Sequence, residues 1–199
     1  MIIPALKKTY RDQVVLDTPE WEFPDHGIVV LQGENGSGKS TLGKILAGIV
    51  KPDMKFSLLV NYRIGYMTQQ PYGFLLSVKK NLLLNSDPSL SKKENSQKAD
   101  ALLSAMGLSE SSKKNAARLS GGQTQRMALA RLLMRQYDMI ILDEPTSSMD
   151  PEMAKKAEDF ILEYHKKTCC QILLITHRKE QAQRFSSLCK VLENGRFLD

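Results

Sequence analysis

The sequence has few cysteines and no long apolar run. Its three cysteines, Cys169, Cys170 and Cys189, are odd in number, and two of them are adjacent. They form no Cys-x-x-Cys pair with partner histidines, which argues against a disulfide framework or a zinc site and favours buried free thiols in a reducing compartment. The longest apolar runs, such as Ile28–Leu31 and Met139–Leu142, are too short to span a bilayer. The N-terminal residues lack the apolar segment of a signal peptide, so we expect any membrane role to depend on a partner.

The chain also lacks a strong charge of either sign. It carries 28 Lys and Arg against 22 Asp and Glu, a formal net charge of +6. This excess suits an anionic ligand, but there is no basic run with interleaved aromatics, so no nucleic-acid partner is expected. With 199 residues, 42% of them hydrophobic, the chain is long enough for one domain with a substantial core.

Short apolar runs alternate with stretches of helical periodicity. The segments Gly27–Leu31, Met139–Leu142 and Ile172–Ile175 are continuous apolar runs, which predicts parallel strands that are buried on both faces. Apolar residues recur at helical spacing through Ser40–Ile49. Further helices are expected at Glu152–Lys166 and Lys179–Phe185, and a last strand at Lys190–Glu193 before an Asn194-Gly195 turn. This alternation predicts a doubly wound α/β core.

The middle of the chain differs, because it contains helical patterns without intervening strands. Helices are predicted at Val78–Leu84, Ser91–Met106 and Gln123–Arg135. We therefore expect a single domain over residues 1–199, with a helical subdomain inserted at about residues 71–136.

A glycine-rich segment, Gly33–Ser40 (GENGSGKS), lies between the first predicted strand and the first predicted helix. Glycines let the backbone curl so that several N–H groups face a phosphate, and the helix N-terminus adds its positive dipole end. Lys39 should reach the β- and γ-phosphates of a nucleotide, and the hydroxyl of Ser40 should bind Mg2+. The residues expected to contact the nucleotide here are Gly33, Asn35, Gly36, Ser37, Gly38, Lys39, Ser40 and Thr41.

Two carboxylates end the predicted strand at Met139–Leu142. Asp143 at the strand end can hold Mg2+ through a water, and Glu144, one residue further on, can polarise an attacking water as a general base. Such a pair can also cap a helix, but its occurrence together with the glycine-rich loop favours a catalytic role.

A third motif, Leu119–Gln123 (LSGGQ), precedes an amphipathic helix. Free N–H groups and a hydroxyl at a helix N-terminus form a second possible anion site. Judged by spacing alone, the motif would be no more than an N-capped helix that follows a flexible loop.

The order of the three motifs closely resembles the ATP-binding cassette family, the motor subunits of ABC transporters. LSGGQ is the signature of that family, and the resemblance runs from about Tyr10 to Gly195. It implies a P-loop NTPase (RecA-like) α/β core, an antiparallel β portion near the N-terminus and an inserted α-helical subdomain. Because Lys51–Asn61 omits a hairpin found in many cassettes, we expect the antiparallel portion to be reduced.

The resemblance assigns roles to four further positions. Tyr10 matches the aromatic that stacks on adenine and is preferred to Trp21, which we expect to pack in a strand. Gln69, or its neighbour Gln70, matches the glutamine that senses Mg2+ and the attacking water. The two remaining assignments are Asp150, in the loop at the dimer interface, and His177, the switch histidine that contacts the γ-phosphate.

The resemblance also implies a mechanism. Two cassettes, identical or different, would form a head-to-tail dimer with ATP and Mg2+ held between the loop of one chain and the signature of the other. Ser120, Gly121, Gly122 and Gln123 would contact the partner's ATP, so a monomer should hydrolyse ATP poorly. Closure on ATP and reopening after hydrolysis would drive transport through a separate polytopic membrane permease, which would place this chain on the cytoplasmic face of the cell membrane.

Two other classes of protein share part of this pattern. The first is a soluble ABC-type ATPase acting on ribosomes, DNA or cofactor assembly, but those proteins usually carry tandem cassettes, long coiled-coil insertions or cysteine clusters. The short Lys39–Gln69 segment is the one feature that favours this class. The second is a small-molecule P-loop kinase, which has no use for LSGGQ.

Overall fold

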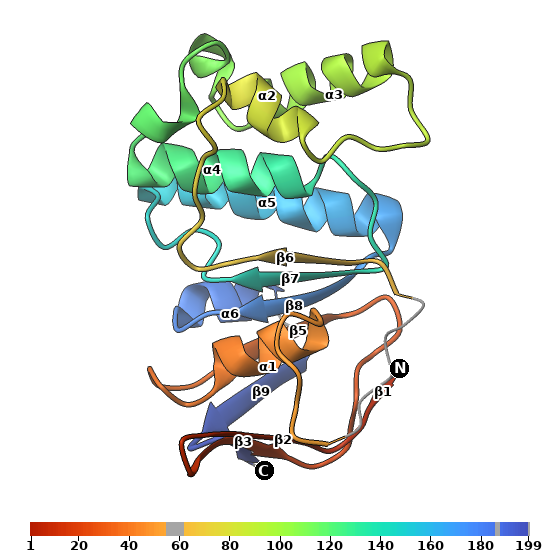
Figure 1. The fold of residues 1–199 in the computed structure, drawn as a ribbon, viewed down its shortest axis with the longest axis vertical. Helices are drawn as coiled ribbons and strands as arrows, with labels where there is room; N and C mark the ends of the chain where they lie inside the picture. Colours follow the sequence, from red (N-terminus) through yellow and green to blue (C-terminus); the bar gives the residue numbers. More distant parts are fainter. Residues whose placement is uncertain (55–61, 186–187, 199) are drawn as a thin grey trace. The chain divides into compact units, whose positions relative to one another are not determined.

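A computed structural model describes residues 1–54, 62–185 and 188–198 (Figure 1). The chain forms two compact units. The first unit comprises Met1–Tyr66, Tyr137–Glu144 and Cys169–Asp199, and the second comprises Met67–Gln136 and Pro145–Thr168.

A six-stranded sheet, in the order β10-β9-β5-β8-β7-β6, organises the first unit. Its strands are β5 (Ile28–Gln32), β6 (Ile64–Met67), β7 (Met139–Asp143), β8 (Gln171–Ile175), β9 (Leu188–Glu193) and β10 (Arg196–Leu198). Strand β5 is parallel to β8 and β9, and β7 is parallel to β8. The predicted turn at Asn194-Gly195, both residues at positive φ, joins the antiparallel pair β9–β10. Strands β7 and β8 are buried at every residue, which confirms the prediction from their continuous apolar runs.

Two antiparallel pairs lie near the N-terminus. Strand β1 (Ile2–Ile3) pairs with β4 (Trp21–Glu22), and β2 (Leu6–Tyr10) pairs with β3 (Gln13–Thr18). Arg11 and Asp12, both at positive φ, form the two-residue turn between β2 and β3, as expected of a tight hairpin. The sequence predicts that Lys51–Asn61 lacks a hairpin. Most of this stretch, residues 55–61, lies outside the described residues, and Lys51–Met54 contain no strand.

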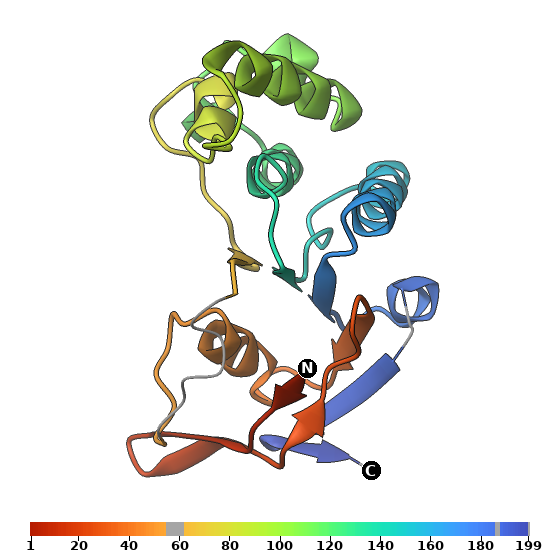
Figure 2. The ribbon, with the colours of Figure 1, turned by 90° about the vertical axis from the view of Figure 1, so that its right-hand side faces the viewer.

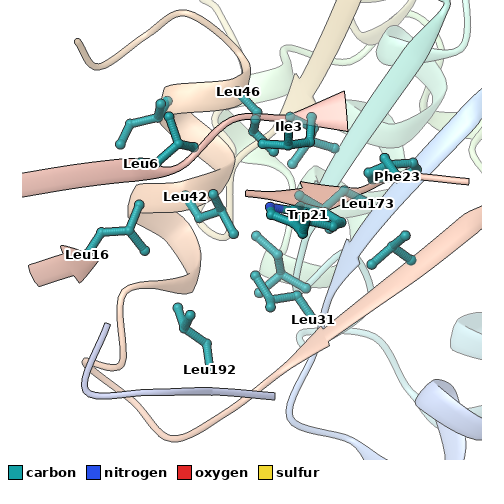
Figure 3. Close-up of a cluster of buried hydrophobic side chains, with 14 of the residues drawn as sticks. Ile3, Leu6, Leu16, Trp21, Phe23, Leu31, Leu42, Leu46, Leu173 and Leu192 are labelled. Atoms are coloured by element: carbon teal, nitrogen blue, oxygen red, sulfur yellow. The ribbon is translucent and has the colours of Figure 1, made fainter. Parts of the chain in front are cut away.

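The hydrophobic core of the first unit lies between the sheet and helix α1 (Lys39–Leu46) (Figure 3). Leu42 of α1 lies in one buried cluster with Leu31 of β5 and Leu173 of β8. Trp21 belongs to the same cluster and is only 6% exposed, so it is a packing residue, as the sequence predicted. Helix α6 (Lys179–Phe185) packs against β5. The prediction of buried thiols holds for Cys170 but is wrong for Cys169 and Cys189, which are exposed.

The second unit is helical. It contains α2 (Val78–Leu83), α3 (Lys92–Ala105), α4 (Gly121–Leu132), α5 (Pro151–Thr168) and two short 3-10 turns, η1 (Ser109–Ser111) and η2 (Ala116–Arg118). Helix α2 packs against both α3 and α4. Figure 2 views α4 and α5 nearly end-on, which shows that their axes are aligned. Among the described residues, no helix is both long and apolar enough to cross a membrane.

Candidate functional site

Two glycines of the loop between β5 and α1, Gly33 and Gly38, lie where a larger residue would clash with neighbouring backbone. Gly33 has φ 147°, and a Cβ there would lie 2.1 Å from the Leu192 carbonyl oxygen. Gly38 has φ 101°, and its Cβ would lie 2.6 Å from the Val15 carbonyl oxygen. Both backbones therefore approach neighbouring strands too closely for a side chain, and the curled loop leads directly into the N-terminus of α1.

Lys39 extends its buried side chain back into this loop. Its Nζ donates hydrogen bonds to the carbonyl oxygens of Gly33, at 2.8 Å, and Glu34, at 2.6 Å. Burial lowers the pKa of Lys39, while the carboxylates of Glu144 and Asp143 act in the opposite direction. The loop thus holds a partly desolvated cation, which suits an anionic ligand because low water content strengthens charge pairing.

Asp143 is the buried last residue of β7. The hydroxyl of Tyr66 donates a hydrogen bond to its Oδ2 at 3.0 Å. Burial, followed by the charge of Asp143, raises the pKa of Tyr66 well above its usual value, so the phenol keeps its proton. Tyr66 was not predicted from the sequence, in which its only signal was an aromatic residue three positions before Gln69.

Glu144 and His177 are joined at the same edge of the sheet. Glu144 is buried and has a positive φ of 50°, and its amide donates to the Ile175 carbonyl oxygen at 3.0 Å. Its Oε1 accepts from the His177 amide at 3.0 Å and lies 2.6 Å from the His177 ring Nδ1. His177 therefore fixes the orientation of the carboxylate.

The strand register explains why these groups meet. Ile175 pairs with Leu31 of β5 on one side and with Asp143 of β7 on the other. The loop after β5, the carboxylates ending β7 and His177 after β8 therefore share the carboxyl edge of the sheet, where α/β proteins bind ligands. A buried Asp143 carboxylate and the Ser40 hydroxyl are hard oxygen donors of the kind Mg2+ prefers, so these residues fit that ion.

Tyr10 lies at the end of β2, next to the hairpin turn, and is 45% exposed. The Lys8 ammonium lies 5.2 Å from the centre of its ring. Asp53 holds this strand by accepting hydrogen bonds from the Lys8 side chain and from the Thr9 amide. An exposed ring on a braced hairpin can stack on a base, as the sequence analysis expected of Tyr10.

The signature residues begin α4 in the second unit. Ser120 and Gln123 form a reciprocal capping box: Ser120 Oγ accepts from the Gln123 amide, and Gln123 Oε1 accepts from the Ser120 amide. The N-capped helix inferred from spacing alone is therefore present. Helix geometry gives the amides of Gly121 and Gly122 no acceptor within the helix, so they are oriented outward from its N-terminus.

The remaining predicted residues also belong to the second unit. Gln69 and Gln70, which follow β6, are both exposed. Asp150 caps helix α5 by accepting a hydrogen bond from the Met153 amide at 3.0 Å. Gln125 was not predicted from the sequence. Its buried side chain forms hydrogen bonds with Ser147 and Ser148, and residues so far apart in the chain cannot be paired from sequence.

A curled glycine loop with a buried lysine, beside a strand that ends in buried carboxylates, defines a phosphate-loop nucleotide-binding protein of the α/β class. The sequence profile described as "ABC transporter" matches residues 16–147. The chain therefore belongs to the ABC transporter family, as one of its ATP-binding, ATP-hydrolysing subunits, which confirms the family and activity expected from the three motifs.

Relatives with known roles match almost the whole chain. The tungstate uptake system ATP-binding protein TupC of Peptoclostridium acidaminophilum is 36% identical over 98% of this chain and 94% of its own length. The sulfate/thiosulfate import ATP-binding protein CysA of Mycobacterium tuberculosis (strain ATCC 25618 / H37Rv) is 32% identical over 98% of this chain. The match spans 59% of the length of that second relative.

Solved structures share the fold. A nucleotide-free ATP-binding cassette from an ABC transporter superposes with a TM-score of 0.83 at 26% identity, covering 100% of this chain and 90% of its own. The cassette MJ0796, in a dimeric post-hydrolysis state bound to ADP and Pi, gives a TM-score of 0.87 at 24% identity, covering 100% and 97% of the two chains. The predicted fold class, a P-loop NTPase core with a helical portion, is confirmed.

Proposed function

We propose that this chain powers uptake of a solute through a separate membrane permease, and that its own site is only half of the site that hydrolyses ATP. The observation that supports ATP hydrolysis is that Lys39, Asp143 and Glu144 lie together at one edge of the sheet. The direction of transport rests on the relatives named for tungstate uptake and sulfate import. Because these relatives serve transport, they do not favour the alternative of a soluble ATPase acting on ribosomes, DNA or cofactor assembly.

In this proposal, residues of the first unit bind and activate the nucleotide. The loop amides from Gly33 to Thr41 and the Lys39 ammonium hold the phosphates, and Tyr10 stacks on the base. Ser40 and Asp143 would hold Mg2+, which would neutralise phosphate charge when bound. Glu144 accepts a proton from the attacking water, and its hydrogen bonds to His177 keep the carboxylate in place for that step.

The second unit would serve the ATP of another cassette, either a second copy or a different one. The outward amides of Gly121 and Gly122, with Ser120 and Gln123, are suited to the γ-phosphate oxygens of a nucleotide held by that partner. Asp150, at the N-terminus of α5, would face the partner chain. The division of the chain into two units supports a helical signature subdomain at about residues 71–136 within one functional domain, residues 1–199.

An exposed apolar segment supports the proposed permease contact. Directly after Gln69 and Gln70, the side chains of Tyr72 and Leu75 are 62% and 81% exposed, and those of Phe74 and Leu76 are also exposed. Contiguous exposed apolar side chains of this kind mark protein contacts more often than free surface. We propose that this segment binds the permease and so brings the chain to the inner face of the membrane.

The replacement Glu144→Gln tests the proposal. It keeps the size of the side chain but removes the proton acceptor, so hydrolysis should fall by at least about 100-fold while ATP binding persists and an ATP-bound dimer accumulates. Glu20→Gln, at an exposed position, is the control. Hydrolysis that continues at the original rate in Glu144→Gln would exclude Glu144 as the base. Failure to co-purify with any polytopic membrane protein would exclude the transport role.

A further inference from the structure

Gln125 is a fully buried polar side chain in the second turn of α4, and its exposed fraction is 1%. Its amide group binds the loop that precedes α5. Nε2 donates to Ser147 Oγ at 3.1 Å, and Oε1 accepts from the Ser148 amide at 2.8 Å. Since the Ser148 amide can only donate, it fixes which end of the Gln125 amide carries the oxygen.

A second, independent contact joins the same two segments. A Cβ at Gly122, in the first turn of α4, would lie 2.6 Å from the Ser148 carbonyl oxygen. The backbone of the loop therefore packs directly on the helix start, and only glycine allows this approach. Gly122 and Gln125 thus hold the backbone of Ser148 from its carbonyl and amide sides.

We infer that Gln125 is a positioning residue, which holds the Ser147–Asp150 loop and the LSGGQ helix start together as one preformed surface for a partner cassette. The inference rests on the proposed function, in which both segments face that partner. A loop that is already ordered loses less conformational entropy when the dimer closes, so a fixed loop favours closure. Gln125 lies inside the unit and acts only through the groups that it holds.

Hydrogen exchange at the Ser148 amide tests the contact without ATP. The replacement Gln125→Leu keeps a side chain of similar size but removes the hydrogen bonds to Ser147 and Ser148, so exchange at Ser148 should become about tenfold faster. Gln97→Leu, at an exposed position of α3, is the control. Unchanged exchange in Gln125→Leu would overturn the inference, as would faster exchange spread over the whole second unit, which would indicate general destabilisation.

Dimer formation then tests the consequence. In the Glu144→Gln background, Gln125→Leu should raise the protein concentration needed for an ATP-bound dimer about tenfold, and the ATP affinity of the monomer should not change. If Glu144→Gln alone forms no dimer with ATP, the proposed function is wrong. If it dimerises, and Gln125→Leu dimerises at the same concentration, only the inference about Gln125 is wrong.

Discussion

Under the proposed function, the two units would contact phosphate oxygens in different ways. In the first unit the loop is fixed by close backbone contacts at Gly33 and Gly38, and it contains a buried lysine beside buried carboxylates. In the second unit the corresponding groups are the neutral amides at the exposed start of α4, capped by Ser120. A charged, desolvated site can bind a nucleotide alone, whereas neutral amides at a surface contribute only after another chain presents the phosphate. The contrast is the physical basis for proposing that a single chain binds ATP but needs a second chain to hydrolyse it.

Lys39→Ala should give the largest effect and tests the first half of the contrast. Loss of a charge-assisted contact to the phosphates should lower ATP affinity about 100-fold. Isothermal titration of the monomer measures the affinity. Lys44→Ala, on the same helix, is the control and should bind ATP normally. An affinity within about threefold of the original would mean that the loop amides suffice without the cation.

Gly122→Ala and Gly121→Ala form a matched pair in the second unit. A Cβ at Gly122 would lie 2.6 Å from the Ser148 carbonyl oxygen, whereas a Cβ at Gly121 meets nothing nearer than Ser148 Cβ at 3.8 Å. We expect Gly122→Ala to lower the free energy of unfolding by about 1–3 kcal/mol. Gly121→Ala should be neutral or stabilising by up to about 1 kcal/mol, since alanine favours helix.

Denaturant unfolding of the two variants measures this difference, and ATP titration of each monomer tests the contrast between units. Neither change should alter ATP affinity, because both glycines belong to the unit that we propose contacts the partner's nucleotide. Equal stability of the two variants would contradict the close packing of the loop on α4. A loss of ATP affinity in either monomeric variant would contradict the assignment of these glycines to the partner's nucleotide.

Much of the first unit could be predicted from sequence because its signals are local. Continuous apolar runs identified β7 and β8, and the loop could be recognised because glycine, lysine and serine occur in a fixed order between a strand and a helix. The start of α4 was placed two residues late, at Gln123. Glycine has low helix propensity, but the Ser120–Gln123 capping box overrides that preference.

The contacts that orient the site could not be predicted, because they join residues far apart in the chain. The hydrogen bond from Tyr66 to Asp143 spans 77 positions, and those from Gln125 to the loop before α5 span 22 and 23. Strand β6 also escaped detection, since its sequence, IGYM, is only four residues long and contains a glycine. Periodicity describes one element at a time and contains no information on which side chains meet between elements.

Tyr66→Phe tests whether the Tyr66 hydroxyl supports Asp143 in the first unit. It removes the hydrogen bond to Asp143 Oδ2 and leaves the ring in place, so the carboxylate is held less firmly. We expect the Mg2+ concentration needed for half-maximal nucleotide binding to rise about fivefold, as for the loss of one hydrogen bond to a charged group. A Mg2+ titration at fixed nucleotide measures this, with Tyr62→Phe as the control at an exposed ring. An unchanged Mg2+ requirement would show that Asp143 needs no support from the phenol.

The smallest effect is expected at Asp138, which precedes β7 and so lies at the opposite end of that strand from Asp143. Asp138 accepts hydrogen bonds from the side chain and the amide of Arg63, and the side-chain bond is the main reason why its pKa is lowered. A lowered pKa in the folded state stabilises the protein above the pKa of the unfolded chain, about 3.9, and that contribution is lost as the pH falls through the folded value. Because both side chains are more than a third exposed, we expect only about 0.5 kcal/mol at pH 7.

Urea unfolding of Asp138→Asn at pH 7 and at pH 3 measures this contribution, and the difference from the original protein should shrink at pH 3. Arg63→Gln should cost a similar amount, and the double replacement should cost little more than either change alone, since the two side chains share one interaction. A difference that stays constant or grows at pH 3 would rule out the ion pair as its source. ATP affinity should be unaffected in all three variants, because the nucleotide groups of the first unit gather at the carboxyl edge of the sheet and Asp138 lies at the other edge.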